Sequence, residues 1–239
     1  MALSGERPGV PIGFAHRGAR AERRENTIDA FARALELGAT GLESDAWITA
    51  DGVVVLDHDG VTGPLWRRRA ISAQVRSDLA GHIPSLEELY EKCGTAYELS
   101  LDIKDPAAVE PIVAVAGGAG ALERLWLCYG DWRSLAEWRE RTDGAGLVVS
   151  TSVSRFPEGF SARIRTLHDV GVAAVNLRRT EWDGERVAAV HDAGLRAFGW
   201  DAQSARQLST LIEMNLDGIY SDHVKRMMAA IAARSGRRT

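Results

Sequence analysis

Residues 14–59 read FAHRGARAERRENTIDAFARALELGATGLESDAWITADGVVVLDHD, and they contain a strand–helix–strand unit almost in full. The apolar run 11–15 predicts a first strand, and residues 40–45 predict a second one. Between them, residues 27–37 carry apolar side chains at three- and four-residue spacing, which is typical of an amphipathic helix. Two strands joined through such a helix run parallel, so the stretch predicts a right-handed βαβ unit.

The same alternation of strand and helix continues to the end of the chain. Residues 53–57 read as an extra strand that pairs locally with the second one. The later expected strands are Ala96–Lys104, Leu122–Cys128, Gly146–Ser150, Ala173–Leu177, Leu195–Trp200 and Leu216–Ser221. The later expected helices begin near Ser85, Pro106, Trp132, Glu158, Trp182, Ser204 and His223. This count predicts a (β/α)8 TIM barrel; a doubly wound sheet is the alternative, weakened because no GxGxxG follows the first strand.

Two helix starts carry recognisable capping residues. Ser85 followed by Glu88 three residues later predicts a capping box, in which each side chain bonds the other residue's backbone N–H. Asn26, in the run Glu25-Asn26-Thr27, is the expected N-cap of the first helix.

Composition bounds the class of protein. The 239 residues are 45% hydrophobic, which is enough for one substantial core, and we expect a single domain over 1–239 with its core at about 11–234. The net charge of -4 is too mild to favour nucleic acid. No apolar leader and no membrane-length apolar run is present, so we expect a soluble, cytoplasmic protein. Cys93 and Cys128 are expected to be reduced, buried thiols.

A pair of carboxylates marks the second expected strand. Glu43 and Asp45 are two residues apart, so they project from the same face of a strand. Their mutual repulsion is relieved by a bound cation, and oxygen ligands favour Mg²⁺, Ca²⁺ or Mn²⁺ over zinc. The alternative is a pair of solvated acids at a strand end.

The third strand of the expected barrel offers a further acid and a cation. Asp102 at its end is the best third metal ligand, and Lys104 two residues on can hold an anionic substrate group. Glu98 shares this face but lies about 13 Å away along the strand, so one ion cannot bind both acids. Glu98 is therefore expected inside the barrel or at its lower rim.

Two histidines lie at strand ends close to these acids. His16 and His58 can each pass a proton near neutral pH, so we expect both to act in catalysis. Arg17 can grip a phosphate oxygen pair, and Gly18 lets the backbone approach it closely. Trp200 ends the seventh strand, where it serves either as an apolar wall for substrate or as core packing.

Motifs spread over nearly the whole chain resemble, in their order, those of the glycerophosphodiester phosphodiesterase family. The matching elements are His16-Arg17-Gly18, Glu25-Asn26-Thr27, Glu43-x-Asp45, Thr49-x-Asp51-Gly52, His58-Asp59, Ile83-Pro84-Ser85-Leu86-Glu87-Glu88, Asp102-Ile-Lys104, Trp200 and Asp217-Gly218-Ile219. The resemblance implies a barrel of the phospholipase C-like phosphodiesterase type, with its site at the carboxyl ends of the strands.

The resemblance also implies a role for each site residue. It implies metal binding by Glu43, Asp45 and Asp102, general acid and base roles for His16 and His58, and phosphate binding by Arg17 and Lys104. The implied cofactor is a divalent metal, Mg²⁺ or Ca²⁺ with Mn²⁺ as an option. The implied reaction is hydrolysis of a small-molecule glycerophosphodiester to glycerol 3-phosphate and an alcohol.

The chain departs from the family pattern at several positions. Asp102 stands where glutamate is usual, and Arg24 stands where a proline usually precedes Glu-Asn-Thr. The usual Trp-Thr-x-Asn segment is Trp200-Asp201-Ala202-Gln203 here. The connection from His58 to Ile83 is short and contains Trp66-Arg67-Arg68-Arg69, which suggests an open site able to take a bulky alcohol or a lipid headgroup.

Two alternatives to the leading function follow from these departures. One is a related phosphodiesterase acting on lysophospholipids or other phosphodiesters. The other is a barrel that binds phosphate esters without turning them over. Pattern leaves open the leaving alcohol, the metal, the oligomeric state and whether water or a neighbouring hydroxyl attacks phosphorus.

Overall fold

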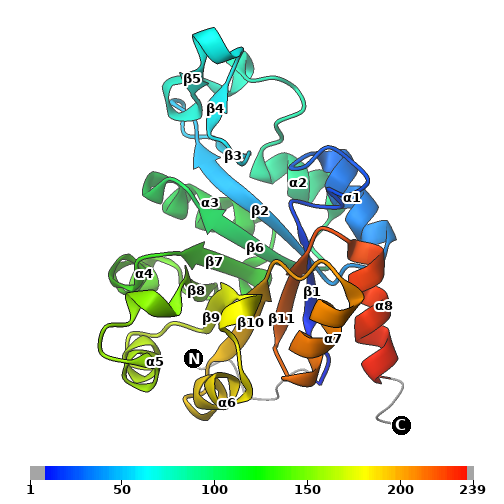
Figure 1. Ribbon diagram of the computed structural model, residues 1–239. Coiled ribbons are helices and arrows are strands. Elements are labelled where there is room, and N and C mark those ends of the chain that lie inside the picture. Colours follow the sequence, from blue (N-terminus) through cyan, green and yellow to red (C-terminus); the bar gives the residue numbers. More distant parts are fainter. Residues whose placement is uncertain (1–8, 236–239) are drawn as a thin grey trace.

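The structure is a computed structural model, and it describes residues 9–235 of the chain. Strands and helices alternate along the described chain (Figure 1). The strands are β1 (Ile12–His16), β2 (Gly41–Ile48), β3 (Val54–Leu56), β4 (Val61–Thr62), β5 (Arg69–Ala70), β6 (Glu98–Ile103), β7 (Leu125–Tyr129), β8 (Gly146–Thr151), β9 (Ala174–Arg178), β10 (Arg196–Trp200) and β11 (Gly218–Ser221). The helices are α1 (Ile28–Glu36), α2 (Leu86–Cys93), α3 (Val109–Gly118), α4 (Trp132–Trp138), α5 (Phe160–Asp169), α6 (Gly184–Asp192), α7 (Ala205–Glu213) and α8 (Val224–Ser235).

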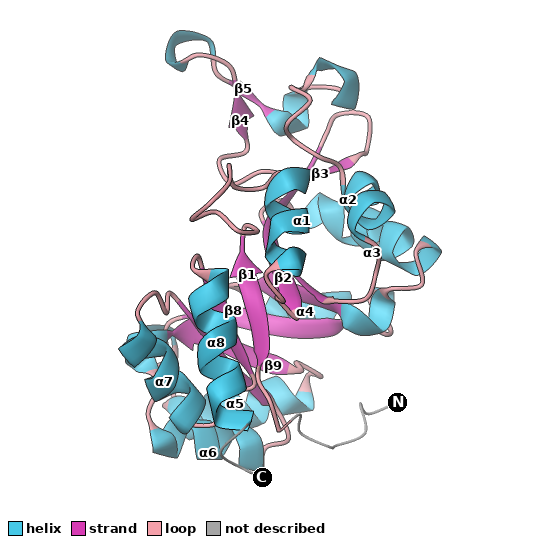
Figure 2. Cartoon of the chain, turned by 90° about the vertical axis from the view of Figure 1, so that its right-hand side faces the viewer, coloured by secondary structure: helices cyan, strands magenta, loops and turns pink. Residues whose placement is uncertain are grey.

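Parallel strand pairing closes the sheet into a barrel. Along the sheet the order is β1-β11-β10-β9-β8-β7-β6-β2, and β1 also pairs with β2, so the ring has no free edge. All of these pairings are parallel. The helices lie outside the strands (Figure 2). The predicted (β/α)8 barrel is confirmed, and the doubly wound alternative is wrong.

The extra strand lies where the sequence places it. β3 runs antiparallel to the end of β2, with Trp47 opposite Val55. A small hairpin of β4 and β5 follows, and it projects beyond the barrel in Figure 1. This excursion, residues 57–85, connects β3 to α2 and lies at the end of the barrel toward which β2 points.

Among the strands, the predicted boundaries differ most at β2, which runs to Ile48 instead of ending at residue 45, and at β7. β7 begins at Leu125, because residues 122–124 form a short 3-10 turn instead of the start of the strand. The N-cap of α1 is Thr27, whose hydroxyl accepts the backbone N–H of Ala30, so the expectation for Asn26 is wrong. Asn26 has a positive φ of 52° and is used elsewhere, as described below.

Large side chains fill the interior of the barrel. Alternate residues of each strand point inward, which puts Phe14, Phe198 and Tyr220 in one cluster. The Phe14 and Tyr220 rings stack at 4.6 Å, and the edge of one ring meets the face of the other for Phe14 and Phe198 at 5.5 Å. Cys128 is buried in this cluster and Cys93 is half-buried; neither is in a disulfide. The barrel is therefore a packed core, and a substrate can enter only from its rim.

The capping box of α2 is confirmed: Ser85 accepts the backbone N–H of Glu88, and the Glu88 carboxylate accepts the backbone N–H of Ser85. Among residues 9–235, no helix has the length and apolar character needed to cross a bilayer.

Candidate functional site

Strand order brings the predicted acids and His16 to one side of the carboxyl-end rim. β1, β2 and β6 are neighbours, and their register sets His16 beside Glu43 and Asp45 beside Asp102. Residues far apart in sequence thus share one edge of the barrel. Because β3 lies outside the ring, β6 is the third strand of the barrel, and its Asp102 is the neighbour of Asp45.

Asp45, Asp102 and Lys104 form a compact charged group. The Lys104 ammonium lies 3.0 Å from Asp45 Oδ1 and 2.5 Å from Asp102 Oδ2. Burial raises the pKa of Asp102, and the neighbouring ammonium only partly offsets this. Burial lowers the pKa of Lys104, but the charges of the two aspartates outweigh it and hold that pKa above its usual value. Lys104 is therefore charged at neutral pH and forms an ion pair with each of the two acids.

Glu43 is the carboxylate with the weakest compensation. Its side chain is 9% exposed, and one oxygen accepts the Arg17 backbone N–H at 2.9 Å. Burial raises the pKa of Glu43 to about 7; the charges of Asp45 and Asp102 add to this, against the opposing effect of His16. Binding of a cation next to the Glu43 carboxylate would therefore be strongly favoured.

Arg17 turns toward carboxylates on both sides of the rim. Its backbone has a positive φ of 54°, an uncommon conformation for a residue other than glycine. Its guanidinium lies 3.2 Å from Glu25 and 3.2 Å from Asp45. The predicted phosphate-binding arginine is therefore engaged by a predicted metal ligand in this structure, as Lys104 is.

Asn26 holds Asp45 from the other side. Its amide donates to Asp45 Oδ2 at 3.3 Å, and its carbonyl accepts the buried Ser44 hydroxyl at 2.8 Å. The backbone N–H of Asn26 donates to the Arg17 carbonyl, which ties the two positive-φ residues together. This buried network fixes the orientation of Asp45.

His16 has an acidic partner that the sequence did not reveal. Its Nδ1 lies 2.7 Å from Asp222 Oδ1, and its Nε2 lies 3.8 Å from Glu43 Oε2. Burial lowers the pKa of His16, but the Glu43 charge and the Asp222 hydrogen bond outweigh it, so the pKa is raised. Asp222 follows the last barrel strand two residues after the inward-facing Tyr220, and this strand-end position was the available signal.

His58 lies farther out on the loop after β3. Its ring is 41% exposed, and Nδ1 lies 2.8 Å from Asp59 of the same loop. Asp57 fixes this turn by accepting the backbone N–H groups of Asp59 and Gly60. Within the described chain, His58 makes no hydrogen bond or ion pair with His16 or the three acids.

Of the remaining predicted positions, Trp200 lies on the rim and Glu98 lies half-buried at the opposite end of the barrel. Trp200 ends β10 and is 38% exposed, with the Arg178 guanidinium 5.8 Å from its ring. Glu98 begins β6 at the opposite end of the barrel, where its carboxylate accepts the Trp126 indole N–H at 2.7 Å. Its expected place away from the rim acids is confirmed.

The acids suit a divalent cation in chemistry, but they are not arranged around an ion here. Among residues 9–235, no group of three His, Cys, Asp or Glu side chains is positioned to hold a metal. The reason is visible in the ion pairs, since Lys104 lies between Asp45 and Asp102. The oxygen donors and the raised pKa of Glu43 fit a hard cation such as Mg²⁺ or Ca²⁺.

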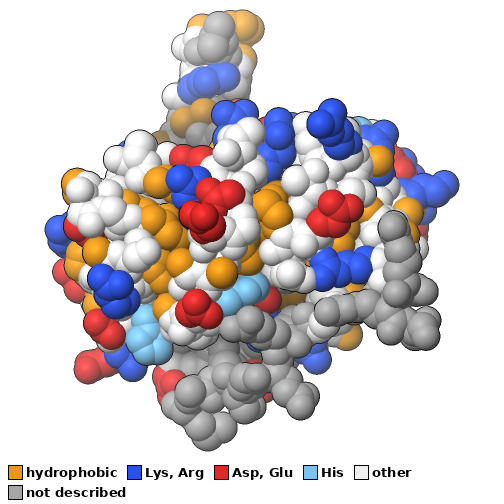
Figure 3. Space-filling model, turned by 60° about the horizontal axis from the view of Figure 1, so that its bottom comes forward, with side chains coloured by type: hydrophobic (Ala, Val, Ile, Leu, Met, Phe, Trp, Pro, Cys, Tyr) orange, Lys and Arg blue, Asp and Glu red, His pale blue; other side chains and the backbone are white. Residues whose placement is uncertain are grey.

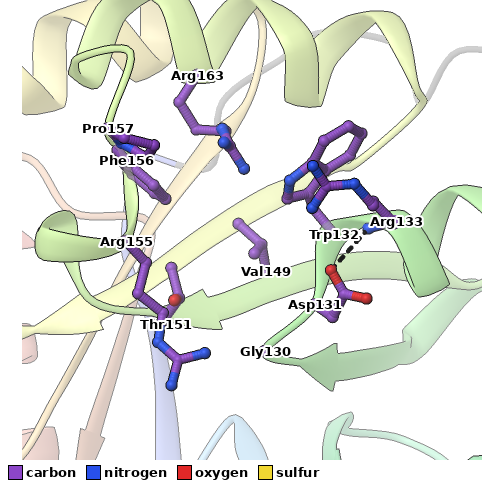
Figure 4. Close-up of a pocket in the computed structure, with 10 residues that line it drawn as sticks. All are labelled: Gly130, Asp131, Trp132, Arg133, Val149, Thr151, Arg155, Phe156, Pro157 and Arg163. Carbon is purple, nitrogen blue, oxygen red and sulfur yellow. Dashed lines mark hydrogen bonds between the residues drawn. The ribbon is translucent and has the colours of Figure 1, made fainter.

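A hollow lies elsewhere on the same rim and is lined by none of the predicted site residues. Its volume is about 290 Å³, and it follows the ends of β7 and β8. Figure 4 shows Phe156 and Pro157 on one side of it and Trp132 on the other, with Arg163 between them. The Arg163 guanidinium lies 5.0 Å from the Trp132 ring and is ion-paired with Glu158, so its charge is already neutralised.

Comparisons with known proteins find a matching family model, relatives and structures with the same barrel. Residues 16–105 match the model of the glycerophosphoryl diester phosphodiesterase family. A Mycobacterium tuberculosis protein named a probable glycerophosphodiester phosphodiesterase is 28% identical over 255 residues, covering 95% of this chain and 93% of the relative. The matched region of the family model contains every predicted acid, both histidines, Arg17 and Lys104.

Solved structures share the barrel. One from Silicibacter pomeroyi superposes with a TM-score of 0.84 at 22% identity, covering 95% of each chain. A phosphodiesterase from Oleispira antarctica, solved with its product sn-glycerol-3-phosphate, has a TM-score of 0.76 at 20% identity over 93% of this chain and 97% of that one. In its motifs, its barrel and these relatives, the chain is similar to the glycerophosphoryl diester phosphodiesterase family.

Proposed function

We propose that the chain hydrolyses glycerophosphodiesters to glycerol 3-phosphate and an alcohol such as choline or ethanolamine, using one divalent metal ion. The relatives are named phosphodiesterases, and the proposal extends that activity to this chain and assigns its substrate, metal and proton-transfer groups. The observation that carries it is the gathering of Glu43, Asp45, Asp102 and His16 on adjacent strand ends.

Glu43, Asp45 and Asp102 would hold the ion, with Mg²⁺ or Ca²⁺ favoured and Mn²⁺ acceptable. When bound, it would polarise a phosphoryl oxygen and stabilise the charge that develops on phosphorus in the transition state. Asp102 is one methylene shorter than the glutamate usual at this position, so it reaches less far toward an ion. Because Asn26 fixes the Asp45 carboxylate, Glu43 and Asp102 would have to reach an ion bound at Asp45.

The cations of the site change partners in this proposal. Arg17 and Lys104 now neutralise Asp45 and Asp102. With a divalent ion held by these carboxylates, Arg17 and Lys104 would be left to bind the phosphate of the substrate. Arg17 and Lys104 can each pair with either the carboxylates or the substrate phosphate. A metal ion that takes over the carboxylates therefore favours phosphate binding, so metal binding and substrate binding should reinforce each other.

Proton transfer is assigned to the two histidines. His16 Nδ1 is held by Asp222, so Nε2 is the atom that can give or take a proton at the substrate. His58 lies on a more exposed loop and would serve the oxygen on the other side of phosphorus. The attacking oxygen is either water or the neighbouring glycerol hydroxyl; the second route passes through a cyclic phosphate that ³¹P NMR would detect.

The test is release of the free alcohol, choline or ethanolamine, from a panel of diesters, because lysophosphatidylcholine would yield an acylglycerol 3-phosphate in place of glycerol 3-phosphate. The turnover of glycerophosphocholine, glycerophosphoethanolamine and lysophosphatidylcholine is measured with the metal-free protein, and again after Mg²⁺, Ca²⁺ or Mn²⁺ is added. Turnover should vanish on chelation and return with metal. His16→Ala and His58→Ala should each lower turnover on the order of 10²-fold or more while folding survives.

His168→Ala is the matched control, because His168 is exposed on α5 and should not affect turnover. Full activity in either His16→Ala or His58→Ala would remove the assigned proton-transfer role. Full activity after thorough chelation would remove the metal.

A second candidate substrate class, lysophospholipids, is favoured by the excursion between β3 and α2. Its exposed Trp66 and neighbouring arginines lie at the carboxyl-end side of the barrel, which suits a substrate with an acyl chain. Faster turnover of lysophosphatidylcholine than of glycerophosphocholine would select this class.

A further inference from the structure

The excursion between β3 and α2 ends in a tip, residues 64–69, with an unusual surface. Trp66 is 87% exposed, more than any other large apolar side chain in the described chain. Arg67, Arg68 and Arg69 follow it and are all exposed. Within residues 9–235, no carboxylate forms an ion pair with any of the three. The tip is thus a solvent-exposed indole beside three unneutralised guanidinium groups.

The base of the tip is fixed to the barrel. Ile71 is fully buried in a cluster with Val55, and its backbone N–H donates to the Gly60 carbonyl. The Gln74 amide donates to the carbonyls of Arg69 and Ala70 at 3.1 and 2.9 Å. An apolar residue five positions from Trp66 therefore reaches the core, whereas Trp66 is held away from it.

The tip projects from the side of the barrel that carries the site. In Figures 1 and 2, the hairpin of β4 and β5 extends beyond the end toward which β1 and β2 point. His16 ends β1 on that same side, and Asp45 lies near the end of β2. A surface that binds the tip would therefore face the mouth of the site.

We propose that the 64–69 tip docks this protein on an anionic lipid bilayer. Arginine clusters are attracted to anionic headgroups, and tryptophan side chains favour the interface between headgroups and acyl chains. The chain as a whole carries a net charge of -4, so the attraction is local to the tip. On the face of the barrel seen in Figure 3, acidic and basic side chains are interspersed, in contrast to the unneutralised arginines of the tip.

Other partners fit the tip less well. A nucleic acid would need a longer basic track than one hairpin provides. A stable protein partner would need an apolar patch of several side chains, and Trp66 is the only large apolar side chain of the tip that the structure describes as exposed. A bilayer accepts a single indole with flanking arginines, and it can meet a projecting tip without any complementary shape.

Docking would bring the rim of the barrel toward the headgroups, so diesters embedded in the membrane come within reach of the site. This consequence rests on the proposed function. The docking itself does not, because it uses none of the residues assigned to catalysis.

Co-sedimentation with lipid vesicles tests the proposal. Vesicles of phosphatidylcholine alone are compared with vesicles containing about 30 mol% phosphatidylglycerol. The wild-type protein should bind only the anionic vesicles. Two variants should each lower the partition coefficient by about tenfold or more: Trp66→Ala, and the triple change Arg67→Gln, Arg68→Gln and Arg69→Gln. For the triple change the loss should be larger at low salt, because salt screens the attraction between arginine and headgroup.

The matched control removes three unpaired cations from the helices around the barrel, by changing Lys92→Gln, Arg139→Gln and Arg165→Gln. It should bind vesicles as the wild type does. All variants should keep the wild-type turnover of glycerophosphocholine in solution; loss of turnover in every sample would count against the proposed function and leave the docking result standing.

Equal sedimentation of wild-type and tip variants would overturn the proposal, as would equal binding to neutral vesicles or no binding at all. Light scattering supplies a further check. A wild-type dimer that Trp66→Ala converts to a monomer would show that the tip contacts a second copy of the chain instead of a bilayer.

Discussion

Lys104 and Arg17 place two cations among the acids proposed to bind a metal. The 2.5 Å and 3.0 Å contacts of Lys104 with Asp102 and Asp45 make the ammonium a direct competitor of a divalent ion. Residue types and spacing predicted that Lys104 holds an anionic substrate group. They could not show which anion it contacts when substrate is absent, because that depends on side-chain geometry in three dimensions.

Replacing Lys104 should have opposite effects on metal and substrate. In Lys104→Gln the carboxylates lose their ammonium partner, so the affinity for Mg²⁺ or Mn²⁺ should rise by roughly tenfold. The substrate phosphate loses a cation, so KM should rise at the same time. Calorimetric titration of the metal-free protein and steady-state kinetics measure the two effects.

Lys92→Gln removes an exposed lysine remote from the rim and should change neither quantity. If Lys104→Gln weakens metal binding, the exchange of partners is wrong.

Asp222 is proposed to position His16 and to hold its proton. Asp222→Asn removes the hydrogen-bonding carboxylate that helps raise the His16 pKa, so that pKa should fall. A lower pKa means that the ring becomes neutral at lower pH. The NMR titration midpoint of His16, and the limb of the pH–rate profile that it controls, should therefore both move to lower pH.

Asp201→Asn is the control for this change. Asp201 lies on the same rim but pairs with Arg178, at 3.6 Å, and not with His16. An unchanged midpoint in Asp222→Asn, or an equal shift in Asp201→Asn, would remove the positioning role of Asp222.

At the level of elements, the spacing of apolar residues and the capping residues predicted the helices and strands well. The three- and four-residue spacing located α1 to within one residue of its ends, and Ser85 with Glu88 located the start of α2. The start of β7 was missed because residues 122–124 are apolar and charged in a pattern that a strand or a 3-10 turn can share. The N-cap of α1 was misplaced by one residue because Asn26 and Thr27 are both good caps, and tertiary contacts with Asp45 and Ser44 use Asn26.

The capping box of α2 should contribute measurably to stability. Ser85→Ala leaves the Glu88 backbone N–H without its hydroxyl acceptor and should lower the free energy of unfolding by about 1 kcal/mol. Urea denaturation measures the change. Ser209→Ala on the exposed face of α7 should alter stability by less than about 0.5 kcal/mol. Equal effects of the two changes would show that the cap is not stabilising.

At the scale of the whole molecule, closure of the barrel brings the predicted site residues together at one rim. The alternation of strands and helices predicted the ring, and the strand-end rule predicted that His16, Glu43 and Asp102 would share a rim. The same rule did not identify Asp222, because its contact with His16 joins the last strand to the first across 206 positions of sequence. Pairings made only by closure are the least visible from local sequence.

Closure also depends on the aromatic cluster inside the barrel. Phe14 is fully buried between Phe198 and Tyr220, so Phe14→Ala leaves a cavity in the centre of the ring. We expect a loss of about 3–5 kcal/mol in the free energy of unfolding, measured by urea denaturation. Trp66→Ala removes a larger but exposed ring and should change stability by less than about 0.5 kcal/mol. A comparable loss in both variants would contradict this description of the core.

The central claim is that one divalent ion binds at the rim between β1, β2 and β6. Equilibrium dialysis of the metal-free protein against Mn²⁺ measures it directly, with Glu43→Gln, Asp45→Asn and Asp102→Asn as site variants. Glu98→Gln serves as the control, since Glu98 lies on the same face of β6 at the opposite end of the barrel. The account predicts one ion per chain in the wild type and in Glu98→Gln, and binding weakened on the order of tenfold or more in each site variant. Undiminished binding in all three site variants, or no ion in the wild type, would contradict it.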